Sequence, residues 1–292
     1  DEEVKRRVYT KQPYQQWLDE NRLFIDDLPA PERAAGVDVG TVLERQRAFG
    51  YTYEDLRIIL GPTAEKGVQP IASMGNDTPL AVLSNRSRPL YDYFKQIFAQ
   101  VTNPPLDCIR EELVTATETF IGSEGNLLEP GPQSCRMIRL ASPLIDNNDL
   151  AKLREVNATG FRAATIPALF DAAATDGGDA LEQALEALFA EADRQVEHEG
   201  VNILIVSDRG ISPEKAAIPT LLAMGGLHHH LVRRGTRTRV SIILETAEAR
   251  EVHHFAVLIG YGADAINPYL AFESLAKMIE DAPLGSRIAE VH

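Results

Sequence analysis

VNILIVSD, at residues 201–208, is the stretch that decides the fold of this chain. It is a short, continuous apolar run that ends in two polar residues, a pattern typical of a buried strand. The pattern returns in TRVSIILETA at 238–247 and, in a shorter form, in ADAINPYLA at 263–271. We therefore expect three buried strands in the last third of the chain.

Helical patterns alternate with these strands. The stretch 212–235 opens with Ser212 and Pro213, residue types that commonly begin a helix, and the stretch 249–262 predicts a second helix. Strands that alternate with helices at this spacing predict right-handed βαβ units and a parallel sheet. Nearer the N-terminus we expect strands at 135–145 and 161–171 and an amphipathic helix at 177–200.

The first 134 residues predict a mainly helical and loop-rich lobe. Short amphipathic helices are expected at 13–29, 41–50 and 52–67, and a longer helix at 88–101. Pro104 and Pro105 follow this last helix and stop it. The chain has no repeat of fixed period and no low-complexity linker. We therefore predict one mixed α/β domain over 1–292, with the helical lobe at 1–134 followed by a βαβ lobe at 135–292.

The charge of the chain argues against nucleic acid as a partner. There are 43 acidic and 29 basic side chains, and the formal net charge of -14 repels a phosphate backbone. The basic run RRGTRTR at 233–239 contains no aromatic residue and is better explained as solvated loop charge. Its arginines are Arg233, Arg234, Arg237 and Arg239.

Cysteine usage and hydropathy indicate the compartment. The two cysteines, Cys108 and Cys135, are far apart in the sequence, which argues for a reducing compartment and against a metal or iron–sulfur site in this chain. The N-terminus is charged, and the longest apolar runs are far shorter than a bilayer-spanning segment. We expect no membrane partner and a cytoplasmic location, or the plastid stroma for a chain from a photosynthetic eukaryote.

Polar residues at the carboxyl ends of the predicted strands are the candidates for chemistry, because α/β folds bind ligands at that edge. They are Ser207, Asp208, Arg209, Glu245, Thr246 and Asn267. Asp208, Arg209 and Glu245 could form the acid/base set of a stand-alone barrel-like lyase. The alternative is that these groups bond to one another and to loop amides, as ion pairs at strand ends commonly do without catalysis. The residue types favour this structural alternative.

Histidine and glycine patterns do not supply a cofactor site. Three consecutive histidines, 228–230, point about 100° apart on a helix, so they cannot all reach one metal ion. A metal site would need His253 or His254 to lie close to His229 or His230. Neither a GxGxxG loop after a strand nor a GxxxxGK[ST] motif occurs, and GxSxG and HExxH are also missing. We expect no catalytic, cofactor-binding or metal-binding residues in this chain.

Three long segments carry a family resemblance. They are QPIASMGNDTPLAVLS at 69–84, RPLYDYFKQIFAQVTNPPLDCIREELV at 88–114 and HHFAVLIGYGADAINPYLAFE at 253–273. In this order they resemble the central domain of NADPH- or ferredoxin-dependent glutamate synthase large chains. The resemblance implies an α/β domain that is a rudimentary, incomplete TIM-barrel-like relative of a flavin-binding barrel.

The resemblance also implies neighbours within one polypeptide. In the family, a glutaminase domain with an N-terminal cysteine nucleophile precedes this domain, and an FMN-binding domain with an iron–sulfur cluster follows it. This chain begins with Asp1, so we expect an excised, non-catalytic segment of a glutamate-forming oxidoreductase, without the nucleophile, the FMN or the cluster. Such a segment would expose apolar surface, and weak self-association is expected.

The reaction implied by the resemblance needs an internal path for ammonia. Glutamine is hydrolysed, the ammonia travels through a tunnel, and it is added to 2-oxoglutarate with reduction by FMN. The resemblance places the turn at Thr102, Asn103 and Pro104 near the glutaminase junction. Together with Asp77 and Thr78 of an earlier turn, these residues are expected to border the tunnel or an interdomain contact.

Overall fold

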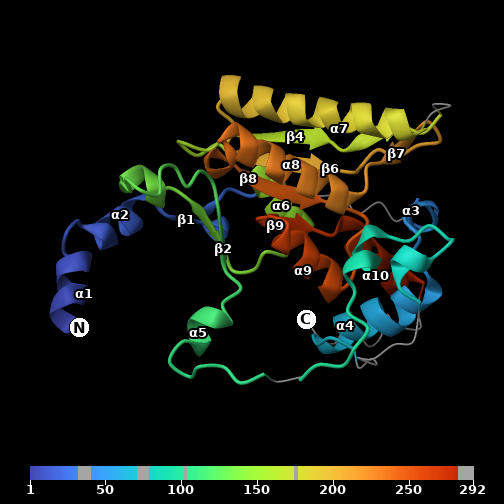
Figure 1. Cartoon of the computed structure of the whole chain (residues 1–292), viewed down its shortest axis with the longest axis horizontal. Helices are drawn as coiled ribbons and strands as arrows, with labels where there is room; N and C mark the ends of the chain where they lie inside the picture. Colours follow the sequence, from blue (N-terminus) through green and yellow to red (C-terminus); the bar gives the residue numbers. More distant parts are fainter. Residues whose placement is uncertain (32–40, 71–78, 102–103, 174–176, 282–292) are drawn as a thin grey trace.

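A four-stranded parallel sheet forms the centre of the computed structural model, which describes residues 1–31, 41–70, 79–101, 104–173 and 177–281 (Figure 1). Its strand order is β4-β6-β8-β9, with bounds Ala163–Pro167, Ile203–Ser207, Ser241–Glu245 and Ala265–Asn267. The parallel sheet and its three buried strands after residue 200 are confirmed.

The register of the sheet aligns the last residue of each strand. Pro167 pairs with Ser207, Ser207 with Glu245, and Glu245 with Asn267. Because side chains alternate between the two faces of a strand, these residues form one row on one face at the carboxyl edge. The sheet thus gathers the predicted strand-end residues in one place.

The sheet is open, in agreement with an incomplete barrel. Beyond β9, Leu144 makes a parallel bridge with Ile266, so the segment before α6 (Asn147–Arg154) adds a fifth position to the sheet. In the part of the chain that the structure describes, no pairing joins this fifth position to β4 at the opposite edge. A closed barrel would need that pairing.

The two faces of the sheet are covered differently. Helices α7 (Gly177–Asp193), α8 (Thr220–Arg234) and α9 (Val252–Gly260) cover the outer face, where the core includes Leu204 and Ile242. On the inner face, Ile205 and Ile243 pack into a second core with α6 and a small sheet.

The small sheet takes strands from both predicted lobes. Its order is β1-β3-β2, with bounds Leu23–Phe24, Ile138–Leu140 and Thr119–Ile121. β1 lies parallel to β3, whereas β2 lies antiparallel to it. The chain on both sides of residue 134 therefore contributes to one sheet.

Short elements make up the rest of the structure. The helices are α1 (Glu2–Tyr9), α2 (Tyr14–Asn21), α3 (Val42–Ala48), α4 (Gly61–Lys66), α5 (Glu111–Val114) and α10 (Tyr269–Glu280). π-helical turns span Asp55–Leu60 and Arg194–His198, and 3-10 turns span Ile25–Asp27, Ala81–Leu83, Leu90–Phe94, Pro132–Cys135 and Arg237–Arg239. No helix among the described residues is both long enough and apolar enough to cross a bilayer.

Three predicted helices need correction. The helix expected at 13–29 ends at Asn21, because Leu23–Phe24 forms β1 and Ile25–Asp27 forms a 3-10 turn. The helix expected at 88–101 is wrong: only a 3-10 turn forms, at Leu90–Phe94, and Phe98 and Val101 are exposed. A short amphipathic segment needs tertiary packing to stay helical, and these side chains have no core to pack against.

The helix expected at 212–235 begins later, at Thr220. Lys215–Ala217 instead forms β7, which pairs antiparallel with β5 (Leu169–Asp171). Pro219 stands immediately before the helix, and a proline disfavours helical geometry in the residue that precedes it. The helix therefore cannot extend back to Ser212.

Truncation of a core side chain on the inner face should destabilise the whole domain. Ile243 is fully buried, so we expect Ile243→Ala to lower the free energy of unfolding by about 2–5 kcal/mol, from lost burial and the cavity left behind. Urea denaturation followed by circular dichroism measures this change. The matched control is Ile58→Ala, because Ile58 is 56% exposed and its loss should cost less than about 0.5 kcal/mol. Equal losses for the two variants would contradict the described core.

Candidate functional site

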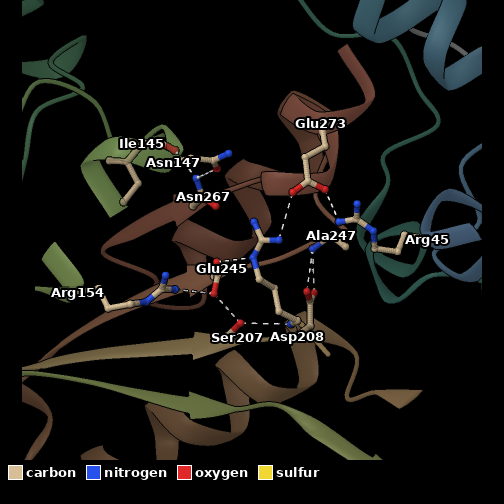
Figure 2. Close-up of polar contacts among 11 residues, drawn as sticks. Arg45, Ile145, Asn147, Arg154, Ser207, Asp208, Glu245, Ala247, Asn267 and Glu273 are labelled. Atoms are coloured by element: carbon tan, nitrogen blue, oxygen red, sulfur yellow. Dashed lines mark hydrogen bonds and ion pairs between the residues drawn. The ribbon is translucent and has the colours of Figure 1, made fainter. Parts of the chain in front are cut away.

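Glu245 is the centre of a charged cluster at the carboxyl edge of the parallel sheet (Figure 2). Its side chain is 3% exposed and accepts three side-chain donors. Ser207 Oγ donates to Oε2 at 2.6 Å, Arg154 Nη2 donates to Oε2 at 2.7 Å, and Arg209 Nε donates to Oε1 at 2.6 Å. Burial raises the pKa of Glu245, but the hydrogen bond from Ser207 and the two guanidinium charges outweigh it, so the net pKa is lowered.

Arg209 joins this carboxylate to a second one. Its Nη1 donates to Glu273 Oε1 at 3.2 Å, and its guanidinium lies 3.8 Å from the centre of the Tyr269 ring. Glu273, on α10, is fully buried and also accepts a hydrogen bond from Arg45 of α3. The cluster therefore pairs two buried carboxylates with three arginines from three different parts of the chain.

The side chain of Asp208 is bonded to neighbours other than Arg209 and Glu245. Its carboxylate accepts from Thr246 Oγ1 at 2.8 Å and from the Ala247 amide at 2.9 and 3.1 Å. Burial raises the pKa of Asp208 to about 7, although the hydrogen bonds from Thr246 and Ala247 oppose the shift. Asp208 thus fixes the start of the loop between β8 and α9.

Asn267 completes the row at the end of β9. Its Nδ2 donates to the Ile145 carbonyl and to Asn147 Oδ1, both at 3.0 Å. These bonds attach the segment that begins α6 to the last strand, as Figure 2 shows. Asn267 therefore helps to hold the fifth position of the sheet.

The three residues proposed as the acid/base set of a lyase form hydrogen bonds and ion pairs within the protein. Arg209 and Glu245 meet in one ion pair, whereas Asp208 bonds to the loop after β8. Asp208 and Glu245 are both nearly fully buried. This is the arrangement of the structural alternative, in which strand-end groups satisfy one another and a loop amide.

Three members of the cluster were missed by the sequence analysis. These residues lie on helices, whereas the sequence pattern pointed only to polar residues at strand ends. They are Arg45, Arg154 and Glu273. Glu273 carried one usable signal, because it lies among apolar residues in YLAFESLAKM at 269–278. A carboxylate in such a helix predicts a buried partner of opposite charge.

The candidates for the ammonia path lie mostly outside the described residues. Asp77, Thr78, Thr102 and Asn103 belong to the parts of the chain that the structure does not describe. Pro104 is described and is exposed. Their role stays a prediction.

Two histidines of the run, His228 and His230, lie in packing contacts, whereas His229 is exposed. His230 is 2.9 Å from Asp193 Oδ2 and stacks on Phe189, and His228 Nδ1 accepts a hydrogen bond from Arg237 at 3.2 Å. His254 stacks on Tyr91 with ring centroids 4.3 Å apart. Over the described ranges, no group of three histidine, cysteine or acidic residues has an arrangement that could hold a metal ion.

Comparison with known proteins identifies the relatives of this chain. Residues 44–291 match the family described as glutamate synthase central domain. The chain is 47% identical over 284 residues to the glutamate synthase [NADPH] large chain of Bacillus subtilis, covering 97% of this chain and 18% of that protein. It is 44% identical over 278 residues to ferredoxin-dependent glutamate synthase 2 of Synechocystis, covering 94% and 17%.

A plant relative gives the same proportions. The chain is 43% identical over 274 residues to the chloroplastic ferredoxin-dependent glutamate synthase of Spinacia oleracea, covering 93% of this chain and 17% of that protein. The chain therefore spans less than a fifth of the length of these relatives.

Asp208 should make the stability of the domain depend on pH. Its folded-state pKa of about 7 lies above the usual value near 4, so between these values the native state holds a proton that the unfolded state has lost. Its contribution to the free energy of unfolding is therefore present at low pH and falls, by up to about 4 kcal/mol, as pH rises from about 4 to about 7. Asp208→Asn should remove this fall.

Urea denaturation at several pH values between 4.5 and 8 tests this sign. The stability of Asp208→Asn relative to the unchanged chain should increase with pH. Asp107→Asn is the matched control, because the Asp107 side chain is 54% exposed and its removal should leave the pH dependence unchanged. A constant difference between Asp208→Asn and the unchanged chain across this range would show that Asp208 is ionised throughout.

Proposed function

The chain belongs to the glutamate synthase central domain family, and on that premise we propose that it is the non-catalytic link between the glutaminase and FMN-binding domains of one glutamate synthase polypeptide. The enzyme would make glutamate from glutamine and 2-oxoglutarate. The proposal is supported by the share of the relatives that the chain spans, which is less than a fifth. Most of the longer polypeptide would then lie in other domains.

One observation carries the linking role: an arm of exposed apolar side chains. We define the arm as residues 95–101 and 104–117, which run between the Leu90–Phe94 turn and β2 and include α5. Ile109 is 89% exposed and Leu113 is 78% exposed, and Phe98, Leu106 and Val114 are also exposed. Figure 1 shows α5 and the chain around it standing away from the sheet and its helices.

Such an arm is costly in water. Each square ångström of apolar surface left exposed forgoes about 25 cal/mol of burial energy, and contiguous apolar patches on soluble proteins commonly mark interfaces. A neighbouring domain of the same polypeptide is always present at high effective concentration, so even a modest apolar contact would stay occupied. We infer that a flanking domain covers the arm. The isolated chain, in which the arm is uncovered, would associate weakly with itself.

Hydrogen exchange can compare this chain with the full-length large chain of the same polypeptide. We expect amides of residues 106–117 to exchange at least about tenfold more slowly in the full-length protein, because a covered segment opens less often. Amides within α7 serve as the internal control, since that helix is already packed on the sheet and should exchange alike in both proteins. Equal exchange of the arm in both proteins would rule out its burial by a flanking domain.

The chemistry of the enzyme would belong to the other domains. An iron–sulfur cluster is held by about four thiolates, and this chain has two cysteines, so its residues do not fit a cluster. It also lacks a glycine-rich phosphate loop for FMN. We propose that FMN, the cluster and the glutaminase nucleophile all lie outside this chain and that the chain alone is inactive.

We further propose that the turn at Thr102, Asn103, Pro104 and Pro105 borders the ammonia path. Two prolines fix the backbone and remove two N–H donors, so a narrow conduit could keep its width without relying on a flexible loop. Asp77 and Thr78 are proposed for the same wall. The alternative is that the prolines only limit the preceding segment.

Changing the polar groups of this turn should uncouple the two half-reactions. In the full-length enzyme, Thr102→Val with Asn103→Leu should raise the ratio of glutamine hydrolysed to glutamate formed from 2-oxoglutarate, because ammonia would escape. Added ammonia should then restore part of the synthesis. The matched control is Thr10→Val, since Thr10 is exposed, follows α1 and lies outside the arm. A ratio that stays coupled, with no response to ammonia, would leave the turn without a role in the path.

A further inference from the structure

A cavity of about 550 Å³ opens at the same carboxyl edge of the sheet, apart from the Glu245 cluster. Two connections after strands form part of its wall: the one between β6 and α8, and the one between β8 and α9. Two N-terminal segments, around Phe49 and around Pro89, form the rest. Its volume lies in the range of about 300–1,000 Å³ that is usual for small-molecule sites.

Basic side chains gather around this cavity in a chain whose formal charge is -14. Arg88, Lys215 and Arg250 line it, and Glu248 is the one acidic residue among the described lining residues. Burial raises the pKa of Glu248, although hydrogen bonds from Thr220 and Tyr91 oppose the shift. The Glu248 carboxylate is also engaged within the protein, because it accepts hydrogen bonds from the Thr220 amide at 3.0 Å and from the Tyr91 hydroxyl at 3.4 Å.

Two of the three basic groups are available to a ligand. Arg250 is already held by Asp55 at 3.2 Å and by the Phe49 carbonyl. Among the described residues, the ion pair that Arg88 forms is a distant one, with 3.9 Å between its Nη1 and Asp92 Oδ2, and its side chain is 38% exposed. Lys215 is exposed and forms no ion pair with any described carboxylate.

Apolar side chains form much of the remaining wall of the cavity, and they include Phe49, Pro89, Leu90, Ile211 and Ala216. The other polar side chains in the lining are those of Ser87, Ser212, Tyr91 and His254. A ligand that fits must therefore combine a negative group with an apolar body, because a bare inorganic ion would leave these side chains facing water. Lysine and arginine on opposing segments would hold the charge, while the apolar walls would fix the orientation.

We propose that this cavity binds a small organic acid, with its carboxylate between Arg88 and Lys215 and its apolar part against Phe49, Leu90 and Ile211. The site is distinct from the linking role proposed above, and it does not depend on that role. It lies where parallel α/β sheets commonly bind ligands, at the carboxyl ends of the strands.

Isothermal titration of the 292-residue chain with 4-methylpentanoate tests the proposal. The carboxylate should bind with one-to-one stoichiometry, and its neutral isostere 4-methylpentanamide should bind at least fivefold more weakly. Inorganic phosphate should also bind more weakly, because it has no apolar body. Raising the salt concentration should reduce the affinity for the carboxylate. Equal affinity for acid and amide would overturn the charge recognition, and tighter binding of phosphate would overturn the organic-acid assignment.

Variants locate the site. Arg88→Gln and Lys215→Gln should each weaken carboxylate binding at least fivefold, while their thermal midpoints confirm that both remain folded. The matched control is Lys66→Gln, because Lys66 is an exposed lysine on α4 that does not line the cavity. Asp171→Asn is a second control: Asp171 lies opposite Lys215 in the β5–β7 register, so its loss should leave binding unchanged or strengthen it. Absence of binding, or equal weakening by Lys66→Gln and Lys215→Gln, would overturn the proposal.

Discussion

Arg209 is the side chain on which the carboxyl edge of this domain depends. It sits just after β6, and its guanidinium pairs with Glu245 at the end of β8 and with Glu273 on α10. Arg154 and Arg45 then attach α6 and α3 to the same two carboxylates. Two buried carboxylates without these partners would be very unfavourable, because a buried charge needs a partner of opposite charge to offset its desolvation. One charged network therefore holds five elements in place.

This network explains how an open sheet can remain stable. A closed barrel covers its inner face with its own opposite strands, whereas here α6 and the small β1-β3-β2 sheet pack on Ile203, Ile205 and Ile243. The strand-end residues that serve ligands in many α/β proteins are bonded to arginines and loop amides instead. The position of an active site is thus used to join secondary structure, which suits a domain whose proposed task is to link other domains rather than to carry out chemistry.

Elements that depend on local sequence were predicted correctly, whereas elements that depend on distant contacts were not. The strand at 201–208 was predicted because a continuous apolar run indicates a strand buried on both faces, which is a property of the segment itself. The helix at 88–101 was predicted wrongly, because its pattern is amphipathic but nothing in the local sequence indicates whether a partner covers the apolar face. The pair Arg45 and Glu273 joins residues 228 positions apart, and no spacing rule connects them.

The loop after β8 depends on contacts with the N-terminal segments of the chain. Tyr51 donates to the Ala247 carbonyl at 2.9 Å and stacks beneath the guanidinium of Arg250, while Asp208 holds the Ala247 amide from the other side of the same peptide segment. Ala247, Tyr269 and Leu270 form a small core that Phe49 and Tyr51 help to cover. Removing the part of the chain before residue 134 would therefore expose this core. It would also remove Arg45 from Glu273, so the buried Glu273 carboxylate would keep one of its two arginine partners. The lobes are mutually dependent at the very edge where the charged network lies.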